Sequence, residues 1–247
     1  MNDLLEHVIS AHGGRERWAR IDGLQAQVTL HGPFWAVRGF SDKPFEETVT
    51  IDTRRELVRF SPWGESGLDF VFSAEDDVVE LRARADDRVL ETRTGIRSTY
   101  RGYGPASPWK PLQVGYFIGY AMWNYLTTPF LLDRPGVVSR EGAEWTENGE
   151  VWRRLHVEFP SAVVTHTTRQ TFYFGDDGLL RRLDYEVDVN VGAVVAHYVS
   201  GYQTFEGIRI PTRRRVHRRN ADNSAGENWS IGIDVHNVGA VGQRPAQ

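Results

Sequence analysis

The sequence contains no cysteine. This absence excludes disulfide bonds, thiolate catalysis, cysteine-based zinc sites, iron–sulfur clusters and thioether-linked lipid anchors. The sequence also has no excess of charge of one sign, because 29 Lys and Arg stand against 33 Asp and Glu. A net charge of -4 provides no field that would favour nucleic acid or an anionic membrane. The composition therefore does not indicate a thiol-dependent redox protein or a nucleic-acid-binding protein.

Long uninterrupted hydrophobic runs are missing as well. Residues 1–14 carry acidic residues and histidine among the apolar positions, so we expect no signal peptide. The longest apolar stretch, residues 114–132, contains Asn124 and Pro129 and falls short of a membrane-spanning helix. With neither an export signal nor a membrane span expected, the predicted location is the cytoplasm.

Motifs that bind the common cofactors are absent too. The sequence has no phosphate-binding loop, no zinc-peptidase motif, no hydrolase nucleophile elbow and no aspartate-rich calcium loop. The eight histidines show no spacing that is typical of metal ligands. We therefore predict neither a cofactor nor a metal ion.

What the sequence does contain is a series of β-branched and aromatic runs separated by turn residues. Among the turns, Asn148-Gly149 favours the type I′ geometry of a hairpin. After an amphipathic helix that ends at Gly13-Gly14, these runs predict a mainly β protein with few helices, built on one large curved antiparallel sheet of about eleven strands, either a half barrel or a sandwich. No linker divides the chain, so we expect a single domain over residues 1–238 and a frayed tail over 239–247.

One segment breaks the strand pattern. Residues 111–126 are apolar on nearly every side, open with a proline at the first helical position and close before Pro129. A helix that is apolar all round must be buried all round, so we place it on the concave face of the sheet. The aromatic rings of this segment and the side-chain amide of Asn124 can line a ligand site, or they can simply fill the core. The candidate ligand-binding residues here are Trp109, Tyr116, Tyr120, Trp123, Asn124 and Tyr125.

A strand over residues 165–174 holds the first candidate catalytic residue. Strand alternation places His166, Gln170 and Phe172 on the inward face. In that position His166 can act as a general base, with Gln170 and Phe172 as ligand-binding residues. The alternative is that His166 is a core histidine whose hydrogen bonds are satisfied.

His197 is the second candidate catalytic residue. It lies in a run that is apolar on both faces, so it needs a hydrogen-bond partner when buried. Asp184 and Tyr185 on the preceding strand can supply one, and a carboxylate is the usual group that orients an imidazole. Asp184 is therefore a third catalytic candidate and Tyr185 a further ligand-binding one, although the alternation of Asp184 with Arg182 and Glu186 favours a solvent-facing carboxylate.

Residues 213–219 form the one basic run of the sequence. On a strand the run divides between two faces, and Arg213, Arg215 and Arg219 share one of them. These cations can contact an acidic carrier protein. The alternative is a solvated face balanced by the acidic turns.

Several of these segments resemble a known family. The N-terminal helix, Gly13-Gly14, Trp18 and residues 21–24 look like the entry to the LolA/LolB-like superfamily of lipoprotein-localisation proteins, and residues 172–181 and 206–212 are similar to its paired strands near the end. The resemblance implies a half barrel with apolar helices over its concave side. It also implies an apolar cavity that shelters an acyl-like or other hydrophobic ligand. The chain departs from the family in having no recognisable export signal and no lipidation cysteine, so only the fold and the cavity carry over.

These observations predict that the chain encloses a hydrophobic small molecule, acyl, polyketide-like or terpenoid-like, between the sheet and the helix. One alternative is a cofactor-independent cyclase or isomerase whose pocket folds such a ligand and whose His166 or His197 moves a proton. Another is an interaction module that uses the basic run. Both pocket hypotheses require a cavity of about 300 Å³ or more.

Overall fold

A computed structural model describes residues 3–64 and 67–243. Its α-helices are α1 (Asp3–Ala11), α2 (Gly14–Trp18), α3 (Pro33–Val37) and α4 (Pro111–Thr127), and its 3₁₀ helices are η1 (Ile96–Tyr100), η2 (Phe130–Asp133) and η3 (Asp188–Asn190). Its strands are β1 (Ile21–His31), β2 (Phe45–Asp52), β3 (Leu57–Trp63), β4 (Leu68–Ser73), β5 (Val78–Ala83), β6 (Val89–Thr94), β7 (Val138–Glu141), β8 (Trp145–Glu147), β9 (Glu150–Glu158), β10 (Arg169–Phe174), β11 (Leu180–Val187), β12 (Ala193–Phe205), β13 (Ile208–Arg219) and β14 (Ala225–Gln243).

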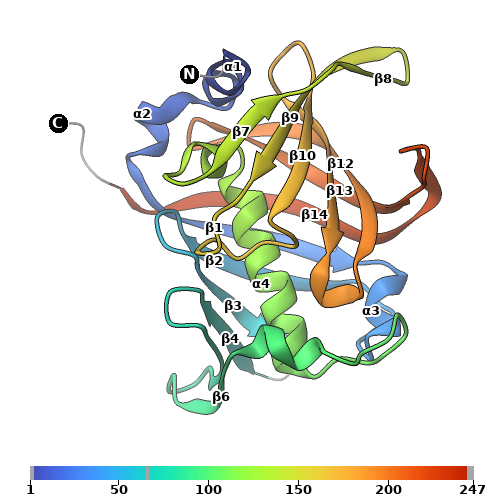
Figure 1. The fold of residues 1–247 in the computed structure, drawn as a ribbon. Coiled ribbons are helices and arrows are strands. Elements are labelled where there is room, and N and C mark those ends of the chain that lie inside the picture. The colour runs from blue at the N-terminus through green and yellow to red at the C-terminus, as the bar shows by residue number, and fades with distance from the viewer. Residues whose placement is uncertain (1–2, 65–66, 244–247) are drawn as a thin grey trace.

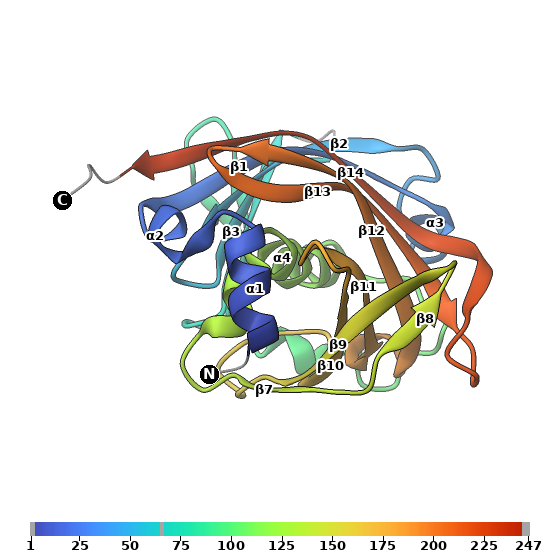
Figure 2. The same ribbon diagram turned by 90° about the horizontal axis from the view of Figure 1, so that it is seen from above.

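The strands build one antiparallel sheet in the order β6-β5-β4-β3-β2-β1-β14-β13-β12-β11-β10-β9-β7, with β8 paired to β9. Strands from the two ends of the chain, β1 and β14, are neighbours at its centre. The sheet curls so that its two halves face each other across α4 (Figures 1 and 2). Its terminal strands β6 and β7 do not pair with each other, so the sheet is open.

The predicted fold class is confirmed, and the number of strands is larger than expected. The part of the chain that the structure describes has 14 strands, because β4, β6, β7 and β8 add to those expected from the sequence. Three of these additions are hard to see in the sequence, since β7 and β8 are only four and three residues long and β6 is exposed at every position. A strand without a buried face carries no hydrophobic alternation.

The hairpin predicted at Asn148-Gly149 joins β8 to β9. Glu147 pairs with Glu150 across a loop of these two residues. Asn148 has φ 51° and Gly149 has φ 82°, and a type I′ turn needs positive φ at both central residues. The local signal therefore predicted both the place and the type of the turn.

The C-terminal segment differs from the expectation of a frayed tail. Residues 239–243 continue β14, and Gly239, Ala240 and Val241 pair with residues of β1. Main-chain hydrogen bonds to a central strand order this segment, although its side chains are small. Residues 244–247 of the expected tail lie outside the described residues.

Helix α4 fills the concave side of the sheet, as predicted. Every residue from Leu112 to Thr127 is buried. The helix lies close against β4, where a Cβ added at Gly115 would overlap the Phe70 ring and one added at Gly119 would lie 3.3 Å from Cβ of Phe72. Glycine thus lets the helix axis approach this half of the sheet. In Figure 2 the sheet surrounds α4, with α1 in front of it. No helix of the described residues is long and apolar enough to cross a membrane.

Candidate functional site

A small cavity lies between α4 and the strands β11 to β14, on the side of the helix away from β4. Its volume is about 40 Å³. It is lined by Phe34, Phe117, Ile118, Ala121, Tyr125, His166, Tyr185, Val187, Asn190, Val195, Val216, Ser230, Ile231 and Ile233. Ligand pockets begin at about 300 Å³. The expectation of a preformed ligand cavity in the concave face is therefore wrong for the described residues, because α4 and its aromatic side chains occupy that space.

A chain of hydrogen bonds runs along the polar edge of this cavity. The hydroxyl of Tyr120 lies 2.9 Å from Nδ1 of His166, and the hydroxyl of Tyr125 lies 2.8 Å from Nε2 of the same ring. The hydroxyls of Tyr125 and Tyr185 are 3.0 Å apart, and the Tyr185 hydroxyl lies 3.2 Å from Nδ1 of His197. The His166 ring also stacks on the Tyr185 ring at 4.3 Å. Four polar contacts thus join four elements: helix α4, the loop that precedes β10, strand β11 and strand β12.

The chain ends at an atom without a partner. Nε2 of His197 is buried and has no hydrogen-bond partner in the described part of the protein. A neutral imidazole donates once and accepts once, so the four hydrogen bonds can all point towards His197 or all point away from it. In the first arrangement His197 presents a free N–H, and in the second it presents a free lone pair. Either form is an unmet hydrogen bond in an apolar interior.

Burial keeps both histidines neutral. It lowers the pKa of His166 to about 3 and that of His197 well below its usual value, with the charges of Arg97 and Arg214 respectively adding to the effect. Burial also raises the pKa of Tyr125 to about 12. A general base works best with a pKa near the operating pH. These shifts therefore favour hydrogen bonding over proton abstraction at neutral pH.

His166 belongs to a loop that three side chains hold in place. It lies before β10, which begins at Arg169, and not inside a strand over 165–174 as expected. Arg97 donates to the main-chain oxygen of His166, at 3.3 Å, and Asn124 donates to that of Val164, at 2.9 Å. The main-chain N–H of Val164 donates to Glu56 at 2.9 Å. The inward direction predicted for His166 is correct, although the loop and not strand alternation produces it.

Of the residues proposed for ligand contact, Tyr125 and Tyr185 line the cavity and Tyr120 reaches it only through His166. Others point elsewhere along α4: Trp123 donates to the main-chain oxygen of Asp52, and Tyr116 accepts from Arg97. The remaining candidates are buried outside the cavity lining; they are Trp109, Asn124, Gln170 and Phe172. Most of these rings thus lie buried in the core, away from the cavity.

Asp184 does not orient His197. It is opposite Ala196 in the sheet, whereas His197 is opposite Leu183, so the two side chains leave opposite faces. Asp184 is nonetheless only 3% exposed, which also corrects the expectation that it faces solvent. On the outer face it binds Arg182 and accepts from the hydroxyl of Tyr173. The partner of His197 is Tyr185.

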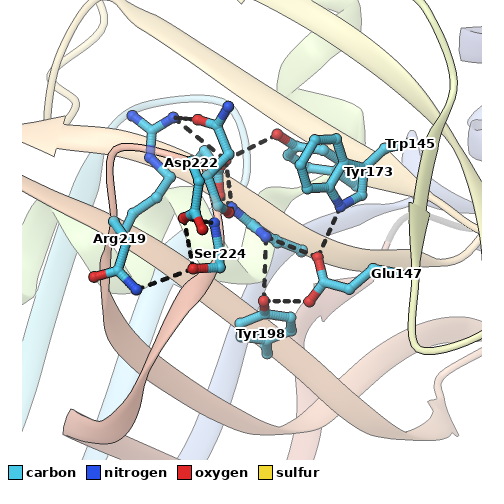
Figure 3. Close-up of polar contacts among 11 residues, drawn as sticks. Trp145, Glu147, Tyr173, Tyr198, Arg219, Asp222 and Ser224 are labelled. Carbon is cyan, nitrogen blue, oxygen red and sulfur yellow. Dashed lines mark hydrogen bonds and ion pairs between the residues drawn. The ribbon is translucent and has the colours of Figure 1, made fainter.

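The outer-face cluster around Arg182 joins elements that are distant in sequence. Figure 3 shows Trp145 of the β8–β9 hairpin beside Tyr173 and Glu147 of the same hairpin beside Tyr198 of β12. Glu147 binds both Tyr198 and Arg182. Arg182 is fully buried and also donates to the main-chain oxygen of Asn223 at 2.7 Å. This cluster holds the hairpin and the β13–β14 turn against the sheet.

The basic run does not form a free cationic face. Arg215 pairs with Asp234 at 2.8 Å, and Arg219 lies 3.6 Å from Asp184, which leaves Arg213 exposed. The structure thus does not support an acidic carrier protein as a partner. Arg214, which was not among the candidates, points into the interior, where Nη2 donates to the main-chain oxygen of Tyr125 at 3.0 Å. The sequence of residues 213–215, three consecutive arginines, does not indicate which side chain is buried, because that depends on the strand register.

No model of a protein family and no curated protein matches the sequence. Solved structures match its fold. One is a DUF1329 family protein from Desulfovibrio piger, with a TM-score of 0.54 and 13% identity over 96% of this chain and 92% of that chain. Another is a LolA superfamily protein from Nitrosomonas europaea, with a TM-score of 0.53 and 10% identity over 97% of this chain and 92% of that chain. The chain has the LolA-like fold.

In this LolA-like fold the cavity comes nearest to the surface beside α3. Asn190 and Ser230 are the half-buried members of its lining. Arg38, which follows α3, donates to the side chain of Asn190 and, at 2.8 Å, to the main-chain oxygen of Ser107. Its guanidinium lies 4.5 Å from the Trp109 ring. Arg38 therefore connects the two halves of the LolA-like sheet across the mouth of the cavity, a role that its position in the sequence does not indicate.

A larger groove, of about 750 Å³, lies at β7, β9, β10 and β11 and is open and polar. Its walls include Arg140, His156, Thr171, Glu186 and Arg219. Charged walls do not suit an apolar ligand. Within residues 3–64 and 67–243, no group of three or more His, Asp or Glu is arranged to hold a metal ion.

Proposed function

We propose that this chain binds a hydrophobic small molecule, acyl, polyketide-like or terpenoid-like, in the concave interior between α4 and the strands β11 to β14. The observation that carries the proposal is the apolar cavity with Tyr125, His166 and Tyr185 on one edge. An apolar wall with a few convergent polar groups is the composition of a ligand site. The LolA-like fold supports the proposal at the level of architecture.

The site must expand when the ligand enters, because about 40 Å³ holds no more than a few water molecules. The expansion has a preferred side. Against β4 the helix is in direct contact through Gly115 and Gly119, whereas on the side of β11 to β14 a cavity lies next to the contacts of Tyr125 with Tyr185 and Arg214. We therefore place the ligand on the cavity side, with α4 remaining on β4 and the mouth between α3 and η3 opening.

Native and denaturing mass spectrometry test this function directly. The purified protein is incubated with a total cellular lipid and metabolite extract, washed, and analysed for retained compounds. We expect one class of hydrophobic compound to remain bound. Retention of no compound, or only of water-soluble charged metabolites, would contradict the proposal.

A variant that fills the cavity locates the site. Ala121 lines the cavity, and Ala121→Leu adds three carbon atoms to its wall, so this variant should lose the bound compound while remaining folded. The matched control is Ala143→Leu, which adds the same side chain at an exposed position before β8. Equal retention by the two variants would place the ligand elsewhere.

A further inference from the structure

Arg214 is a buried cation on the concave side of the sheet. It lies opposite Val199 on β12 and Ile233 on β14, and it is 3% exposed. Its guanidinium carbon is 4.6 Å from the centre of the Tyr125 ring. Both Ile233 and Tyr125 line the cavity, so Arg214 is directly behind the cavity wall.

Within residues 3–64 and 67–243, the charge of Arg214 has no carboxylate counter-ion. Among the residues that the structure describes, no carboxylate lies within 4 Å of its guanidinium, and its one hydrogen bond goes to the main-chain oxygen of Tyr125. Arginine has five N–H donors and remains charged in proteins. A buried charge is normally paired, because its transfer out of water is expensive. Arg182, equally buried, has the carboxylates of Asp184 and Glu147.

A second polar group near Arg214 also lacks a partner. His197 is opposite Val216, two residues along β13 from Arg214, and leaves the same face of the sheet. Such diagonal neighbours are within reach of long side chains. The unpartnered Nε2 of His197 is therefore close to the unpaired guanidinium, and in one direction of the Tyr–His chain it presents an N–H. In that direction both groups are donors beside an apolar cavity, and Arg214 is a donor in either direction.

We propose that Arg214 binds the carboxylate of an amphiphilic ligand, a long-chain carboxylic acid, with His197 as a second donor. This proposal rests on the proposed function and specifies its ligand class. The acyl chain lies in the expanded cavity between α4 and β11 to β14. The carboxylate supplies the negative charge that the described residues do not place beside Arg214, and it accepts from guanidinium N–H groups that the Tyr125 carbonyl leaves free.

Titration calorimetry with dodecanoate and 1-dodecanol tests the carboxylate, since the two share the chain and differ in charge. At pH 8 the acid is ionised. A charge-assisted hydrogen bond in an apolar site adds to the binding free energy of the acid and not to that of the alcohol. We therefore expect the wild-type protein to bind dodecanoate about tenfold or more tightly than dodecanol. Acetate, which lacks the chain, should bind at least about tenfold more weakly than dodecanoate.

Equal affinity for the acid and the alcohol would overturn the carboxylate proposal and leave the proposed function standing. Binding of neither compound would overturn the long-chain acid as the ligand, whereas the proposed function fails only if the extract experiment also retains no hydrophobic compound.

Variants identify the residue. Arg214→Met should lose the preference for dodecanoate and still bind dodecanol, whereas Arg214→Lys should keep a preference because it keeps the charge. The matched control is Arg218→Met, an exposed arginine of the same strand, which should behave as wild type. A dodecanoate preference that persists in Arg214→Met would assign the carboxylate to another group. The wild-type comparison of acid and alcohol decides the ligand class even where a variant does not fold.

Discussion

Arg182 and Asp184, two residues apart on β11, form a bidentate ion pair on the outer face of the sheet, with Nε 2.6 Å from Oδ1 and Nη2 2.9 Å from Oδ2. Both side chains are buried. Removal of one partner of a buried pair leaves the other charge uncompensated, which costs about 3–5 kcal/mol. We expect Arg182→Met to lower the free energy of unfolding by this amount in denaturant titrations.

A double-mutant cycle and an exposed pair serve as controls for this prediction. Arg182→Met with Asp184→Leu should be less destabilised than the sum of the single variants, since both charges of the bidentate pair are then removed together. Arg169 pairs with Glu158 at the surface, and Arg169→Met should cost no more than about 1 kcal/mol. Additive effects at Arg182 and Asp184 would show that the pair is not coupled.

Glu47 gives the stability of the protein a pH dependence. Burial raises its pKa to about 7 from an ordinary value of 4.5, and its carboxylate accepts from the main-chain N–H of Gly64 at 2.8 Å. The folded state therefore holds this proton over a range in which the unfolded chain releases it. The stability that the protonated group contributes is fully present below pH 4.5 and is lost as the pH rises through 7, by up to about 3 kcal/mol.

The variant Glu47→Gln tests this dependence because glutamine keeps the shape and does not titrate. We expect the free energy of unfolding of the wild type, relative to Glu47→Gln, to fall between pH 4.5 and 7 in denaturant titrations. Parallel pH curves for the two proteins would contradict the raised pKa.

Two glycines of α4 should respond differently to alanine. Alanine favours a helix over glycine by about 1 kcal/mol, but at Gly115 its Cβ would overlap the Phe70 ring. Overpacking of this kind costs about 1–3 kcal/mol, so Gly115→Ala should lower the thermal midpoint. Gly119→Ala meets Cβ of Phe72 at 3.3 Å, a contact that a small shift relieves, and should be close to neutral. A midpoint at or above the wild-type value for Gly115→Ala would show that α4 is not held closely against β4.

The hydroxyl of Tyr125 joins His166 to Tyr185, so its removal breaks the Tyr–His chain in the middle. Tyr125→Phe leaves two buried polar groups short of a partner, and each such loss costs about 1–3 kcal/mol. We expect Tyr125→Phe to lower the free energy of unfolding by this amount in denaturant titrations. The control is Tyr103→Phe, because Tyr103 is half-buried and its hydroxyl makes no hydrogen bond within the described residues. Equal stability of the two variants would mean that the chain contributes nothing to the fold.

Asn190 is a half-buried member of the cavity lining, and its side chain accepts a hydrogen bond from Arg38. Asn190→Ala removes this connection between Arg38 and η3, and it should speed the uptake of dodecanol, while Tyr125, His166 and Tyr185 on the polar edge of the cavity stay unchanged. Stopped-flow measurement of the association rate checks this outcome. A rate equal to that of the wild type would show that the ligand enters by another route.

The helix around Trp123, the hairpin at Asn148-Gly149 and the mainly β architecture follow from the sequence, because each depends on residues that are neighbours along the chain. A helix without a polar face must be buried, and a dipeptide that accepts positive φ places a tight turn. His166 was predicted to point inward, but for a reason that the structure corrects. For the hydrogen-bond partner of His197, the sequence offers both Asp184 and Tyr185 and does not decide between them.

The sequence by itself determined the mainly β class, most of the longer strands and the need for a buried helix inside a curved sheet. Only the tertiary structure decided which of three consecutive arginines is buried, which face Asp184 takes and how little space α4 leaves. These outcomes depend on strand register and on side chains that meet from distant parts of the chain, such as Arg214 and Tyr125. A shift of one residue in register reverses every side chain of a strand, and no local pattern in the basic run reports that register.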